Sequence, residues 1–249
     1  RLFKGPEDCS INKYIIKDQF TSIDMYAFSY CNKIKKIKIP DQVYEIKKKA
    51  FIGCSSLTKI KLPINLKTIE ESSLESCEKI KILKIPPKVT NIPNSLCKNC
   101  ISLQKIILPL NLEIIGIMGF QNCTSLNEIK IPNKVIQIQS RAFKNCKSLS
   151  AIKLGKRITD IGEYTFSGCE SLISIVLPFK LIKISSNLFS NCKNLQEVTI
   201  KKNIKSISSD AFDGCDNLQK IILQKGISKD FRSYIEKIFK ELEIVISDI

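Results

Sequence analysis

The chain has 249 residues, 43% of them hydrophobic, which is enough apolar material for one large globular domain or two small ones. Lysine and arginine outnumber aspartate and glutamate by 40 to 24, and the resulting net charge of +16 favours acidic partners. Histidine is absent, which removes the usual general base of hydrolases and the commonest transition-metal ligand. We therefore expect no enzyme, no metal and no cofactor. Only four of the basic residues are arginine, which disfavours sequence-specific nucleic-acid binding, and no apolar run is long enough to span a membrane.

Residues 1–25 form a degenerate first copy of a 23-residue unit that fills most of the chain. Ile11, Tyr14 and Ile16 fall on the apolar positions of that unit when Asp8 takes the place of its cysteine. Cys9 is then out of phase by one residue. We predict that Cys9 is the exposed or reactive thiol.

Residues 26–227 contain nine copies of the unit, of which the last is incomplete. One cysteine marks each copy at a constant spacing of 23 residues: Cys31, Cys54, Cys77, Cys100, Cys123, Cys146, Cys169, Cys192 and Cys215. Apolar residues recur three, six and eight positions after each cysteine, as in the segment AFIGCSSLTKIKLPINLKTIEES from Ala50 to Ser72. Such a period predicts a solenoid, in which each copy adds one coil.

The pattern AFxxCxxLxxIxLPxxVxxI resembles that of the BspA-like leucine-rich repeat family. The resemblance covers roughly residues 8–227 and implies a curved right-handed β-rich superhelix, with one short parallel strand per repeat on its concave face. Members of that family are typically surface or secreted proteins that act in adhesion and partner binding. We expect one domain over residues 1–249.

Two copies depart from the family pattern. Leu74 and Cys97 stand where seven other copies carry phenylalanine, and three prolines lie nearby. We predict a packing defect or a change of curvature at residues 74–97.

Residues 228–249 follow the last copy. Phe231, Tyr234, Ile235 and Ile238 have helical spacing, and Ser228 is well placed to begin the helix. We predict a helical cap over the exposed end of the core.

The nine in-phase cysteines are predicted to form a ladder of buried free thiols. Parallel side chains on coils about 4.8 Å apart leave their Cβ atoms too far apart for a disulfide. Cys97 and Cys100 also form a CxxC pair, which is typical of a redox dithiol or half of a zinc site. Because Cys97 occupies a phenylalanine position, we interpret the pair as a core substitution.

Lysines dominate the outward strand positions of the first six in-phase copies, and this basic character fades toward the C-terminus. They predict a partner-binding concave face: Lys36, Lys38, Lys59, Lys61, Lys84, Lys105, Lys130 and Lys153. Stacked like charges repel unless an anionic partner relieves them, although solvated lysines also protect a sheet face from aggregation.

Three functions are compatible with these features. The first is a monomeric, non-catalytic scaffold at the cell surface or secreted, which recognises a protein or an acidic glycan. The second is an intracellular, cytoplasmic interaction scaffold that forms the recognition part of a longer protein. The third is an enzyme that uses Cys97 and Cys100 as a dithiol.

Overall fold

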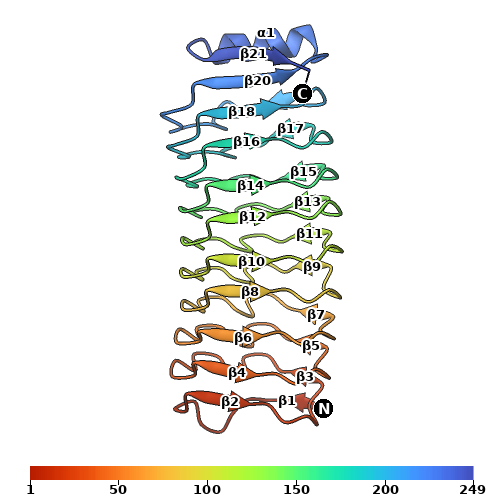
Figure 1. The fold of residues 1–249 in the computed structure, drawn as a ribbon, viewed down its shortest axis with the longest axis vertical. Helices are drawn as coiled ribbons and strands as arrows, with labels where there is room; N and C mark the ends of the chain where they lie inside the picture. Colours follow the sequence, from red (N-terminus) through yellow and green to blue (C-terminus); the bar gives the residue numbers. More distant parts are fainter. Residues whose placement is uncertain (249) are drawn as a thin grey trace.

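The computed structural model describes residues 1–248, which form a stack of coils with the two termini at opposite ends (Figure 1). Parallel strands from successive coils lie above one another, and each coil before the C-terminal cap contributes to two ladders. This architecture is the predicted leucine-rich repeat solenoid.

The first ladder lines one side of the stack, which we call the strand face. Its strands are β2 (Lys13–Ile15), β4 (Lys36–Lys38), β6 (Lys59–Lys61), β8 (Ile82–Lys84), β10 (Lys105–Ile107), β12 (Glu128–Lys130), β14 (Ala151–Lys153), β16 (Ser174–Val176), β18 (Glu197–Ile200), β20 (Lys220–Gln224) and β21 (Glu243–Ser247). In β4 and β6 the central residue is buried and its two neighbours are exposed, as alternation along a strand requires. These strands correspond to the one short strand that the sequence predicts for each repeat.

A second ladder of two-residue strands was not predicted. Its strands are β1 (Leu2–Phe3), β3 (Ser22–Ile23), β5 (Glu45–Ile46), β7 (Thr68–Ile69), β9 (Asn91–Ile92), β11 (Ile114–Ile115), β13 (Gln137–Ile138), β15 (Asp160–Ile161), β17 (Lys183–Ile184) and β19 (Ser206–Ile207). From β5 to β19 the second residue is always a buried isoleucine. A column of β-branched residues therefore holds this ladder against the core.

The 23-residue register extends beyond the in-phase cysteines at both ends. Lys13 pairs with Lys36, 23 residues later, as the alignment with Asp8 in the cysteine position requires. At the other end Lys220 pairs with Glu243, so a strand that was not predicted, β21, continues the same register.

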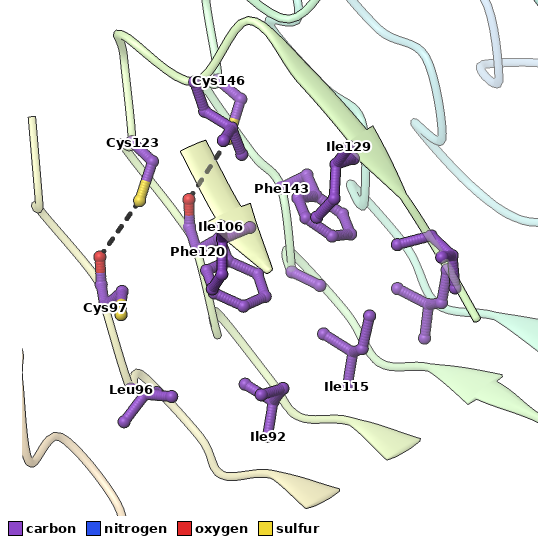
Figure 2. Packing of buried hydrophobic residues seen from close by; sticks show 14 of the residues in the cluster. Ile92, Leu96, Cys97, Ile106, Ile115, Phe120, Cys123, Ile129, Phe143 and Cys146 are labelled. Carbon is purple, nitrogen blue, oxygen red and sulfur yellow. Dashed lines mark hydrogen bonds between the residues drawn. The ribbon is translucent and has the colours of Figure 1, made fainter. Parts of the chain in front are cut away.

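Stacked phenylalanines run through the interior, and Figure 2 shows two of them, Phe120 and Phe143. Phe120, Phe143, Phe166, Phe189 and Phe212 form one continuous stack, with neighbouring ring centroids 5.3–5.8 Å apart. A shorter stack of Phe3, Phe28 and Phe51 fills the first coils. The two stacks are separated by the coils that carry Leu74 and Cys97.

Both ladders are interrupted in the zone where we predicted irregularity, and they are also interrupted between β10 and β12, between β14 and β16 and between β15 and β17. No strand pairing joins β6 to β8 or β7 to β9 within residues 1–248. In the second ladder the amides of Lys47 and Glu70 donate to carbonyls of the preceding coil, at 3.0 and 2.9 Å. The next equivalent residue is Pro93, which has no N–H to donate. Leu74 and Cys97 are nevertheless fully buried, so the irregularity lies in the backbone pairing, and the change of curvature stays a prediction.

The C-terminal cap contains the predicted helix, α1 (Lys229–Ile238). Ser228 is its N-cap, and its hydroxyl accepts a hydrogen bond from the Phe231 amide at 3.3 Å. Phe239 places its ring edge-on against Phe212, with 5.7 Å between centroids, and so covers the end of the phenylalanine stack. The predicted cap is confirmed, with β21 as an added part.

Candidate functional site

All eight lysines predicted to bind a partner are exposed and lie on the strand face. The ladder places them above one another: Lys36 pairs with Lys59, Lys38 with Lys61, and Lys130 with Lys153. Lys13 of β2 is also exposed and pairs with Lys36. The prediction missed Lys13, although its place five residues after Asp8 was a sufficient signal.

The eight predicted strand-face lysines have no acidic partner in the part of the chain that the structure describes. A few lysines elsewhere form ion pairs with carboxylates of the adjacent coil, as Lys98 does with Glu75 and Lys147 with Glu170, both at 3.1 Å. Among residues 1–248, none of the eight predicted lysines forms an ion pair. Their positive charge is therefore not neutralised by the protein itself.

A hollow of about 400 Å³ lies over the first strands of this face. Five lysines line it, together with two aspartates: Lys13, Lys36, Lys38, Lys59, Lys61, Asp18 and Asp41. Clefts lined by charge of one sign concentrate ions of the opposite sign. The densest lysine cluster is thus a concave, accessible surface suited to carboxylate or sulfate groups.

Basic character decreases toward the C-terminal end, as the sequence indicated. The exposed strand positions of β16 are Ser174 and Val176. In β20, Lys220 forms an ion pair with Glu243 at 3.7 Å. On the strand face, the strand lysines that form no ion pair with any residue of 1–248 therefore lie on β2 through β14.

The predicted ladder of nine free thiols is wrong at its first member. Cys31 forms a disulfide with Cys9, and their Cα atoms are 4.9 Å apart. The prediction of Cys9 as an exposed or reactive thiol is wrong for the same reason. Seven ladder thiols from Cys54 to Cys192 are free and buried, whereas Cys215 is free and half-buried.

The free ladder thiols have a structural role that sequence reasoning did not find. Each donates a hydrogen bond to the carbonyl oxygen of the residue at the phenylalanine position of the preceding coil. Cys146 donates to Phe120 at 3.2 Å, and Cys123 donates to Cys97 at 3.2 Å (Figure 2). The same carbonyl also accepts the cysteine amide of its own coil, as Phe120 does from Cys123. The thiols therefore connect successive coils.

Burial keeps these thiols in their protonated, unreactive form. It raises the pKa of Cys54 and of Cys169 to about 12. The neighbouring Cys100 thiol and burial together raise the pKa of Cys97. Reactive cysteines have a lowered pKa and partial exposure. The CxxC pair of Cys97 and Cys100 has neither, since both side chains are 1% exposed.

Alkylation of the native chain should distinguish these thiols. A hydrogen bond with Cys192 lowers the pKa of half-buried Cys215. We expect iodoacetamide at about pH 8 to modify Cys215 first, because a thiol of pKa about 12, such as Cys54, is ionised to only about one part in ten thousand. Peptide mass mapping gives the rates, and the guanidinium-unfolded chain is the control. Modification of Cys97 or Cys100 as fast as Cys215 would contradict their burial.

In the part of the chain that the structure describes, no three His, Cys, Asp or Glu side chains come together to hold a metal ion. Across the same residues, no helix has the length and apolarity to cross a membrane.

Comparison with known proteins identifies similar sequences and folds. The family model for the BspA type leucine rich repeat region, which holds six copies, matches residues 4–127 and 113–240. The pneumococcal vaccine antigen PcpA is 19% identical, with a TM-score of 0.63 over 96% of this chain and 69% of that chain. A leucine-rich repeat protein of Eubacterium ventriosum is 20% identical, with a TM-score of 0.50 over 95% and 73%. A search of curated proteins gave no match. The two structures support the solenoid fold.

Proposed function

Since the chain belongs to the BspA-type leucine-rich repeat family, we propose that it is a non-catalytic scaffold that binds an acidic protein or acidic glycan through its strand face. The observation that carries this proposal is the column of exposed lysines on β4 to β14 that have no acidic partner within residues 1–248. Each coil adds one strip of side chains, so a long anionic chain could contact several coils at once. The high pKa of Cys97 and the burial of the CxxC pair disfavour the dithiol enzyme.

A location at the cell surface or outside the cell is part of this proposal. The Cys9–Cys31 disulfide supports it, because disulfides persist in oxidising compartments and are rare in the cytosol. The remaining thiols are mostly buried and so are shielded from the same oxidants. Finding Cys9 and Cys31 reduced in protein isolated from its own cells would favour the intracellular scaffold instead.

Binding to polyanions of two kinds tests the proposed function. We expect fluorescently labelled polyglutamate and heparin to bind at about 0.05 M salt and to lose at least about tenfold in affinity at about 0.5 M, because salt screens exposed charges. Polylysine is the control and should not bind. Fluorescence anisotropy gives the affinities. Absence of binding to both polyanions, or affinities that salt does not change, would contradict the proposal.

A further inference from the structure

A second hollow on the strand face combines an apolar surface with a rim of lysines. It lies where β6 and β8 meet and has a volume of about 740 Å³, within the range of ligand pockets. The side chains of Ile64 and Ile82 line it and are 50% and 58% exposed. Exposed Pro87 lies beside them, and buried Leu62 also lines the hollow. Ile82 occupies the strand position that Lys36 and Lys59 occupy in the two preceding coils.

The hollow lies at one of three interruptions of the first ladder, of which the other two fall between β10 and β12 and between β14 and β16. At intact junctions the amide four residues after the cysteine donates to the equivalent carbonyl of the preceding coil, as Thr58 does to Lys35 at 3.0 Å and Gln104 to Lys81 at 2.8 Å. At this junction, neither the Lys81 amide nor the Thr58 carbonyl has a backbone partner among residues 1–248. Both residues line the hollow. A ligand placed here therefore meets one free backbone donor and one free backbone acceptor.

Positive charge surrounds the apolar surface. Four exposed lysines line the hollow, with one carboxylate, that of Asp41: Lys59, Lys61, Lys81 and Lys84. None of these lysines forms an ion pair with any residue that the structure describes. A ligand that fills the hollow must accordingly be apolar at its centre and anionic around it.

We propose that this hollow binds a segment of an acidic polypeptide and receives one or two of its aliphatic or aromatic side chains. The carboxylates that flank this anchor would contact Lys59, Lys61 and Lys84, and its backbone would meet the free groups of Thr58 and Lys81. Peptide groups carry both a donor and an acceptor, whereas the exposed isoleucines offer little to a sulfated glycan. The inference rests on the proposed function and selects a protein ligand over a glycan.

Two synthetic peptides of equal charge test the inference. Both carry glutamates on either side of a central pair, which is leucine and phenylalanine in one peptide and two serines in the other. We expect the first to bind at least about tenfold more tightly at low salt, because its central side chains lose apolar surface to water. Fluorescence anisotropy with each labelled peptide measures the ratio.

Paired variants locate the effect. The double variant Ile64→Ser with Ile82→Ser should remove the difference between the peptides and leave the affinity for the serine peptide unchanged. The control, Ile173→Ser with Val176→Ser, removes two side chains that are 50% and 54% exposed near the other end of the chain, and should keep the difference. If the unchanged chain binds the two peptides with equal affinity, or if the double variant at Ile64 and Ile82 still prefers the first peptide, the apolar anchor in this hollow is overturned. The proposed binding of acidic ligands by the strand face would stand in either case. Failure of both peptides to bind would overturn the proposed function as well.

Discussion

Replacing Phe143 with alanine is expected to lower the free energy of unfolding by about 3–5 kcal/mol. The ring is fully buried and stacks between Phe120 and Phe166, at centroid distances of 5.4 and 5.8 Å. Its removal leaves a cavity and breaks two ring contacts of the longer stack. Coils of a solenoid contact only their neighbours, so the loss weakens the connection between the two ends of the chain. Urea unfolding followed by circular dichroism measures the effect.

Phe179→Ala is the matched control for this experiment. The Phe179 side chain is 46% exposed, and substitutions at exposed positions usually change stability by less than about 0.5 kcal/mol. A loss below about 1 kcal/mol for Phe143→Ala would mean that the stack does not hold the coils together.

Changing five strand-face lysines to serine is expected to weaken polyglutamate binding by at least about a hundredfold at low salt. The five are Lys36, Lys38, Lys59, Lys61 and Lys84. Exposed charge pairs contribute up to about 1 kcal/mol each, so five together account for two or more powers of ten. Stability should stay the same or rise, because Lys36 lies beside Lys59 and Lys38 beside Lys61 in the ladder.

The control for this variant removes the same charge from outside the strand face. It changes five exposed lysines to serine: Lys67, Lys134, Lys193, Lys205 and Lys229. We expect its affinity for polyglutamate to fall by less than about fivefold, since only the net charge changes. Equal losses in the two variants would mean that binding follows net charge and has no preferred face.

Features that repeat in phase could be predicted from the sequence. The period of 23 residues places every strand of the first ladder from β4 to β20, and Asp8 extends it to β2. Alternation then identifies which lysines are exposed, and all eight that were named lie on the strand face. Helical spacing and Ser228 locate α1. In each case the signal is local or is copied many times.

Features outside the repeat phase could not be predicted in the same way. Parallel side chains in register disfavour a disulfide between two in-phase cysteines. Cys9 is one residue out of phase with Cys31, so this restriction does not apply to the pair. The hydrogen bonds of the thiols depend on carbonyls 26 residues earlier, which the side-chain pattern does not show. For β21 a signal existed, because Ile244 and Ile246 lie 23 residues after Ile221 and Leu223.

The hollow between β6 and β8 could be predicted only in part. Sequence reasoning identified an irregular zone from Leu74, Cys97 and the nearby prolines. The structure shows a loss of backbone pairing at this junction, as at three others, and in the second ladder Pro93 has no N–H to donate here. Which side chains border the opened junction depends on the packing of two coils, and so required coordinates.

Lysine acetylation footprinting most directly tests the claim that the strand face binds acidic ligands. The chain is acetylated briefly with and without saturating polyglutamate, and mass mapping gives the rate at each lysine. We predict that polyglutamate slows the acetylation of four strand-face lysines by at least about fivefold, because bound amines lose access to the reagent: Lys36, Lys38, Lys59 and Lys61. The acetylation rates of Lys67, Lys205 and Lys229 should stay within about twofold of their values without polyglutamate. Equal protection of both groups, or protection of the second group alone, would contradict the account.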